Sequence, residues 1–147
     1  MARQNLLPVA LEAFREARTP EWFEARDWII ENLAAECPPD DGVSALPPGP
    51  RAMVRKVGFF YDNLGVFVAY QVVAEGLVIG FFGQGMNQLW QVLEPYIRRE
   101  GEIRQMRYMV FFEDLVRRYR RCGPAEVYEG LGLGQAPDDP AQTLTVS

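Results

Sequence analysis

Apolar side chains recur at steps of three and four between Arg51 and Glu75, which is the repeat of one face of an α-helix. The repeating positions are Met53, Val57, Phe60, Leu64, Phe67 and then Gln71. Strand-like alternation fails in the run from Gly58 to Tyr61. Pro50 suits a first helical turn, and Gly76 suits the left-handed residue just past a helix end. The pattern therefore predicts one helix over residues 51–75.

A second stripe on the same segment consists almost entirely of small side chains. It contains Gly58, Asp62, Gly65 and Ala69. Another helix can approach closely along such a stripe, and tight packing there offsets the cost of about 1 kcal/mol that each internal glycine imposes. Asp62 lies in the middle of the stripe. If the stripe is covered, Asp62 must be paired or hydrogen-bonded, because an unpaired buried carboxylate takes up a proton instead.

Glycines punctuate the segment that follows. Gly76, Gly80, Gly83 and Gly85 surround a short apolar piece, which predicts a turn or two of helix ending near Gly83. Helical spacing then resumes at Met86, Leu89, Trp90, Leu93 and Ile97. Pro95 is expected to kink or end this second helix, since proline donates no hydrogen bond to the preceding turn.

The run from Phe59 to Glu100 resembles the core of a bacterial family known as domain of unknown function 4760. The resemblance rests on Tyr61, Leu64, Gly65, Leu77, Val78, Phe82, Gly83, Trp90, Pro95, Tyr96 and Ile97. It covers roughly the middle and end of the chain. The resemblance implies an all-α fold and no known activity, so it assigns no catalytic residues. Some members carry an N-terminal membrane anchor, and this sequence shows none.

The flanking segments also predict helices. Helices are expected over Leu7–Arg18, from a Thr19-Pro20-Glu21 start to near Cys37, over Glu102–Arg121, and as a short turn through Val127 and Tyr128. The fold class is therefore an all-α, single-domain bundle of five or six helices. We expect an N-terminal helical hairpin (1–37), a Pro-rich linker (38–50), a helical core (51–123) and a mobile acidic tail (124–147).

The linker contains five prolines and two glycines in thirteen residues. This composition is typical of a semi-rigid, polyproline-like arm over the surface. A spacer between the hairpin and the core is the favoured interpretation. The alternative is a ligand for a partner that recognises Leu46-Pro47-Pro48.

Absent residues exclude several chemistries. The chain has no histidine, which removes Ser-His-Asp and Cys-His catalysis and the usual zinc sites. Cys37 and Cys122 stand alone, without metal-ligand spacing, and no signal peptide precedes them. We expect reduced thiols, no metal or cofactor, and a cytoplasmic location. The net charge of −5 argues against a general nucleic-acid-binding surface.

Two sets of charged residues are candidate sites. Asp62, Glu75 and Glu94 could converge between helices in a small-molecule or enzymatic pocket. Arg117, Arg118, Arg120 and Arg121 could hold the phosphates of RNA or an anionic lipid, or could simply complement a helix C-terminus and pair with acids such as Glu113 and Asp114.

The segment Leu64–Gly83 is long and apolar enough to test as a membrane span. Glu75 near its centre and Gly76, predicted to end the helix there, favour a soluble core instead. The favoured function is a non-enzymatic interaction or scaffolding module, acting on another protein or by self-association through apolar surface left between helices. The carboxylate pocket and phosphate binding by the last helix are the alternatives.

Overall fold

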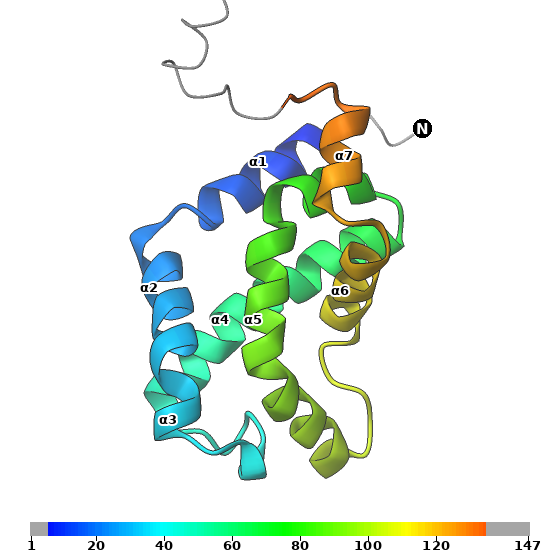
Figure 1. Cartoon of the computed structure of the whole chain (residues 1–147). Coiled ribbons are helices and arrows are strands. Elements are labelled where there is room, and N and C mark those ends of the chain that lie inside the picture. Colours follow the sequence, from blue (N-terminus) through cyan, green and yellow to red (C-terminus); the bar gives the residue numbers. More distant parts are fainter. Residues whose placement is uncertain (1–5, 135–147) are drawn as a thin grey trace, which may run out of the picture.

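The computed structural model of the chain describes residues 6–134, and every regular element in this range is helical. The elements are α1 (Leu6–Glu16), α2 (Pro20–Trp28), a π-helical turn (Ile29–Leu33), α3 (Ala34–Glu36), a 3-10 turn (Pro39–Asp41), α4 (Pro48–Ala69), α5 (Glu75–Arg104), α6 (Val110–Cys122) and α7 (Pro124–Gly130). Figure 1 shows α5 running in front of α4, with α2 on one side, α6 on the other, and α1 and α7 across one end. The predicted all-α, single-domain fold is confirmed.

The small-residue stripe of α4 is covered by the start of α6. A Cβ atom on Gly58 would lie 2.7 Å from Cε of Met109, and one on Gly65 would overlap the backbone carbonyl of Phe111. At Gly65 the neighbour is backbone, so no larger residue fits without moving the two helices apart, whereas at Gly58 the flexible end of the Met109 side chain would have to shift. The predicted close approach of a second helix along this stripe is therefore correct.

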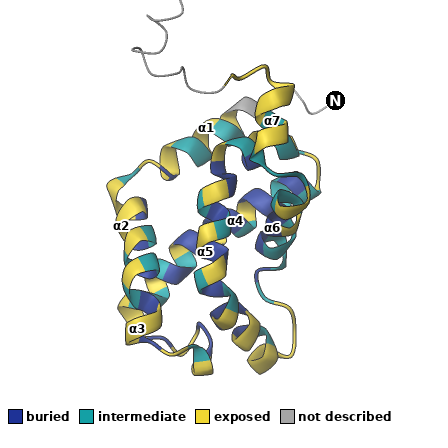
Figure 2. Cartoon of the chain, viewed as in Figure 1, coloured by how far each residue is buried: buried dark blue, intermediate teal, exposed yellow. Residues whose placement is uncertain are grey.

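Aromatic rings fill the space between the helices. Trp22 of α2 packs edge-on against Phe60 of α4 at a centroid distance of 5.1 Å. Phe112 of α6 contacts Tyr61 of α4 at 5.2 Å and Trp90 of α5 at 5.1 Å. Figure 2 shows the buried residues gathered along the inner sides of α4 and α5. One continuous aromatic core thus joins α2, α4, α5 and α6.

The N-terminal helices follow their predicted signals. The Thr19 side chain accepts a hydrogen bond from the Trp22 amide at 3.3 Å, with Pro20 as the first residue of α2. The hydroxyl of Tyr96 on α5 donates to the carbonyl oxygens of Leu33, at 3.3 Å, and Cys37. These carbonyl groups lie in the last turn of the helical segment, which was predicted to stop near Cys37.

The region between α4 and α5 differs from its prediction. Helix α4 ends at Ala69, and Gln71 takes a left-handed conformation (φ 60°) in the turn that follows. Gly76 lies inside α5 and does not end a helix. This turn also divides the long apolar segment Leu64–Gly83 between two helices.

Helix α5 is continuous where the sequence predicted two helices. It passes Gly83 and Gly85 without a break and continues beyond Pro95 and Gly101. Two of its glycines serve packing: a Cβ on Gly83 would lie 2.5 Å from the Tyr119 ring of α6, and one on Gly80 would lie 2.9 Å from Val127 of α7. The helix does not end at Pro95, and Figure 1 shows its last part running at an angle to the rest.

The last long helix starts eight residues later than predicted, at Val110. Residues 105–109 form a loop bounded by left-handed Gln105 and Met109 (φ 57° and 49°). Met109 is buried, whereas Met106 in the same loop is 66% exposed.

Residues 38–50 are packed more closely than a polyproline arm. Val43 and Leu46 are buried, and Pro48–Pro50 form the first turn of α4. The fixed φ of proline suits a first helical turn, so the prolines at 48 and 50 begin the helix. The predicted short turn through Val127 and Tyr128 is α7, while residues 135–147 of the expected tail lie outside the described residues.

The contact of Gly65 with Phe111 gives a test of this packing. We expect Gly65→Ala to destabilise the fold by about 1–3 kcal/mol, because the added methyl group forces α4 and α6 apart. The matched control is Gly49→Ala in the same helix, where nothing lies within 4 Å of the added atom. That change should stabilise by up to about 1 kcal/mol. Urea unfolding of both variants measures the difference, and equal effects would contradict this account.

Candidate functional site

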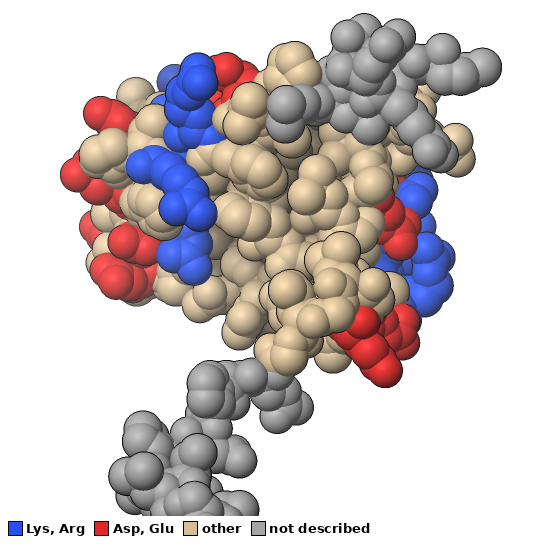
Figure 3. All heavy atoms as spheres, turned by 90° about the horizontal axis from the view of Figure 1, so that it is seen from above, with Lys and Arg blue, Asp and Glu red and all other residues tan. Residues whose placement is uncertain are grey.

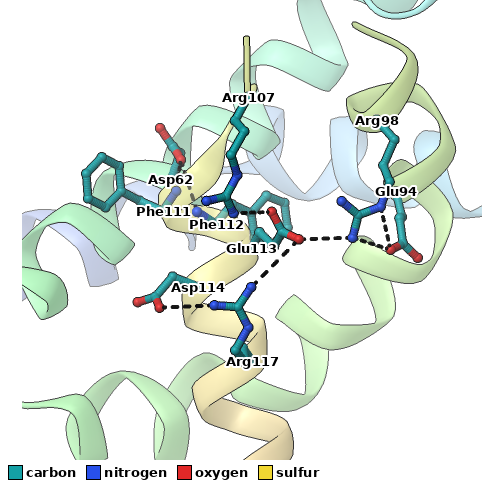
Figure 4. Close-up of polar contacts among 9 residues, drawn as sticks. All are labelled: Asp62, Glu94, Arg98, Arg107, Phe111, Phe112, Glu113, Asp114 and Arg117. Atoms are coloured by element: carbon teal, nitrogen blue, oxygen red, sulfur yellow. Dashed lines mark hydrogen bonds and ion pairs between the residues drawn. The ribbon is translucent and has the colours of Figure 1, made fainter. Parts of the chain in front are cut away.

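Asp62 forms a cap on α6. Its Oδ1 atom accepts hydrogen bonds from the backbone amides of Phe111 and Phe112, each at 3.0 Å, which lie in the first turn of that helix (Figure 4). Burial raises the pKa of Asp62, and the two backbone hydrogen bonds oppose that rise. The covered carboxylate is therefore hydrogen-bonded, as the sequence required.

Glu75 and Glu94 have separate partners. Glu75, the first residue of α5, accepts a hydrogen bond from Arg118 at 2.8 Å. Glu94 accepts from Arg98, four residues later on the same helix, at 2.9 Å. Neither shares a partner with Asp62, and no group of acidic or cysteine side chains within residues 6–134 is suited to holding a metal ion. These contacts favour a structural role for each of the three carboxylates.

The four candidate arginines of α6 are engaged with neighbouring side chains. Arg118 pairs with Asp114 at 2.7 Å and with Glu75 at 2.8 Å, and Arg121 lies 4.0 Å from Glu75. Arg120 donates to the amide oxygen of Asn87 at 3.0 Å. Arg117 lies 3.9 Å from Glu113 and 4.0 Å from Asp114, which are the helical pairs the spacing predicted. These contacts favour the structural interpretation of the cluster over anion binding.

Glu113 is the centre of a larger ion-pair network between α5, the 105–109 loop and α6. One of its oxygens accepts from Arg98 at 2.9 Å and the other accepts from Arg107 at 2.8 Å, as Figure 4 shows. Burial alone would raise the pKa of Glu113, but the hydrogen bonds from Arg107 and Arg98 outweigh it and lower the pKa. Glu113 is thus held as a fully charged acceptor. The sequence suggested its pairing with Arg117 but not its links to Arg98 and Arg107.

An open cleft of about 450 Å³ adjoins this network. Its lining consists of Ile97, Arg98, Gly101, Glu102, Met106, Arg107, Tyr108 and Glu113. Burial raises the pKa of Tyr108, so its hydroxyl stays protonated near neutral pH. The arginines and Glu113 in the lining already neutralise one another.

Glu100 is a buried charge that sequence reasoning missed. This residue of α5 is 1% exposed and accepts hydrogen bonds from the amides of Val43 and Ser44, at 2.8 and 2.9 Å, and from the Ser44 hydroxyl at 2.6 Å. Arg104, one turn later, donates at 2.5 Å. Burial would raise the pKa of Glu100, but these donors lower it to about 2. These hydrogen bonds hold Val43 and Ser44, which follow the 3-10 turn, against α5.

The end of the molecule formed by α1, the start of α5 and α7 presents an apolar surface, which we call the end face. It consists of Leu11, Leu77, Phe81, Tyr128, Leu131 and Leu133. Phe81 packs on Phe14 of α1 with ring centroids 4.4 Å apart, and Tyr128 donates to the carbonyl of Gly80 at 3.0 Å, so the three elements are in contact. Figure 3 shows this end as an uncharged area bordered by charged side chains. The hydrophobic surface patch expected for an interaction module is therefore present.

The fold and these clusters define an all-α, single-domain protein whose candidate acidic and basic residues are engaged in hydrogen bonds and ion pairs within the bundle. The chain belongs to the family described as domain of unknown function (DUF4760), which it matches over residues 3–119. The match includes the N-terminal helices, which lie outside the region of resemblance found in the sequence. Comparison with curated proteins and with solved structures finds no match. Within residues 6–134, no helix combines the length and apolarity needed to span a membrane.

The cap at Asp62 can be tested by two substitutions. We expect Asp62→Ala to destabilise the fold by about 1–2 kcal/mol, because two amides of α6 lose their acceptor. Asp62→Asn keeps an acceptor oxygen and removes the half-buried charge, so it should be close to neutral at pH 7. The raised pKa of Asp62 means that its contribution to stability declines as pH rises through that pKa. Thermal unfolding at pH 4 and pH 7 measures both effects, and equal losses for Asn and Ala would contradict the assignment.

Glu100 should produce the opposite pH dependence. Because its pKa is lowered to about 2 from an ordinary value of 4.5, Glu100 stabilises the folded state above pH 4.5 and loses this effect as pH falls towards 2. The shift corresponds to about 3 kcal/mol. Glu100→Gln should therefore lower stability at pH 7 by about that amount and flatten the acid limb of the profile. Glu102→Gln, an exposed neighbour, is the control; a matching effect there would refute the role of Glu100.

Proposed function

We propose that the chain is a protein-interaction module that works through its end face and not through a catalytic pocket. The observation that carries this proposal is the group of six large apolar side chains left between 42% and 69% exposed on three adjoining elements. Contiguous apolar patches of several hundred Å² are uncommon on monomeric proteins and mark sites of association.

The rigidity of the end face supports this role. Gly80 of α5 allows α7 to lie close to α5, since a Cβ there would meet Val127 at 2.9 Å. On the other side, Phe14 of α1 stacks on Phe82 with ring centroids 5.6 Å apart. Leu11, Leu77, Phe81 and Tyr128 therefore project from helices that are held by internal packing, and Leu131 and Leu133 follow directly after α7. A preorganised surface loses little conformational entropy when a partner binds.

The polar groups of the chain support the catalytic and phosphate-binding alternatives less well. Asp62, Glu75 and Glu94 each have a separate hydrogen-bond donor. A phosphate would have to displace carboxylates from Arg117 and Arg118. The apolar side chains of the end face, by contrast, remain between 42% and 69% exposed.

Site-specific photo-cross-linking tests this proposal. A benzophenone amino acid replaces Phe81 or Leu131 on the end face, or Met106 as a control, which at 66% is about as exposed as Leu131 but lies on the loop before α6. Irradiation in the native cell should give discrete protein adducts from the two end-face positions, at several times the yield from position 106. Their masses identify the partner, including a second copy of the chain. Equal yields at all three positions would refute the proposal.

A further inference from the structure

We infer that the end face is the interface of a two-fold symmetric homodimer, an inference that rests on the proposed function and names its partner. The first argument is area. Six large side chains that are roughly half exposed present on the order of 600 Å² of apolar surface. A standard protein interface covers about 800 Å² on each partner, with an apolar centre and a polar rim. The apolar residues of the end face thus provide the centre, and their charged neighbours provide the rim.

The second argument is the distribution of charge along the rim. Arg15 of α1 pairs with Glu12 of the same helix at 3.6 Å, whereas Arg18 follows the end of α1, with its guanidinium 5.5 Å from the ring centroid of Phe81. Glu126 and Glu129 lie on α7, beside Tyr128. Arg18 and Glu129 are both exposed, and neither forms an ion pair within residues 6–134. The α1 edge of the end face thus offers one unpaired cation, Arg18, and the α7 edge offers an unpaired anion, Glu129.

A two-fold axis lying in the plane of the end face exchanges these edges. The α1 edge of one copy then meets the α7 edge of the other, which brings Arg18 close to Glu129 of the second copy and repeats the contact by symmetry. Such self-complementarity is the requirement for a closed dimer. The apolar centres meet each other in the same operation.

A membrane surface is the alternative occupant, and the charges favour a second copy. Interfacial membrane-binding surfaces combine apolar side chains with an excess of Lys and Arg. Here Glu126 and Glu129 border the apolar centre, and the chain has a net charge of −5. Both features repel anionic lipid, whereas in the dimer Glu129 has Arg18 of the second copy as its partner.

Sedimentation velocity across a range of concentrations measures the dimer directly. The wild-type chain should show a reversible monomer–dimer equilibrium, with a dissociation constant on the order of micromolar. The double change Leu131→Ser and Leu133→Ser should raise that constant at least about tenfold. Met106→Ser removes a side chain of similar exposure from a distant loop and should leave the constant within about twofold. Circular dichroism confirms that each variant is folded.

A charge exchange tests the two-fold arrangement itself. Arg18→Glu alone and Glu129→Arg alone should each weaken the dimer by about tenfold at low salt, because like charges then face one another. The two changes together in one chain should restore the constant to within about threefold of the wild type. Failure of the combined variant to recover would refute the proposed pairing.

Two further results would overturn the inference. One is a wild-type chain that stays monomeric at concentrations on the order of 100 µM. The other is co-sedimentation of the monomer with vesicles of phosphatidylcholine and phosphatidylserine that is lost on changing Leu131 and Leu133. Cross-links from Phe81 and Leu131 to other proteins, together with a monomeric chain, would leave the proposed function standing and reject only the homodimer.

Discussion

The closeness of α4 and α6 is the constraint on which the rest of the structure depends. Gly58 and Gly65 allow the backbones to approach, and Asp62 between them provides the acceptor that the first amides of α6 need. The short separation also brings Phe112 between Tyr61 and Trp90. A wider spacing would open the aromatic core and leave helix amides without partners. Packing and hydrogen bonding are therefore satisfied by the same stripe of α4.

The sequence predicted that another helix would cover this stripe, though not which one, because both of its signals are local. Helical periodicity places Gly58, Asp62 and Gly65 on one side of a single helix, and a buried carboxylate there requires donors. The break expected near Gly83 was wrong because a glycine that ends a helix and a glycine that admits a neighbouring ring look alike in sequence. Only the position of Tyr119, 36 residues further on, distinguishes them. Likewise, nothing near Glu100 in sequence indicates that the amides of Val43 and Ser44 are its donors.

The ion-pair partners of the arginines were only partly predictable from the sequence. Spacing on a helix gave the pairs within α6, such as Arg118 with Asp114, but not the cross-helix pair of Arg118 with Glu75. These longer contacts tie the start of α5 to α6, and Arg98 with Glu113 does the same near the other end. The arginine-rich helix thus joins the bundle through its charged side as well as its apolar side. Most of its charge is balanced before any ligand is considered.

The cap on α6 also has a consequence for the order in which the protein forms. Its acceptor, Asp62, lies 49 residues before Phe111, and the whole of α5 separates them. During synthesis, α4 therefore leaves the ribosome with its glycine stripe uncovered and waits for more than fifty further residues. The core closes only when α6 has emerged. Until then the nascent chain exposes the side of Tyr61 that Phe112 later covers. A chaperone or a neighbouring nascent chain can bind this exposed apolar surface during that interval.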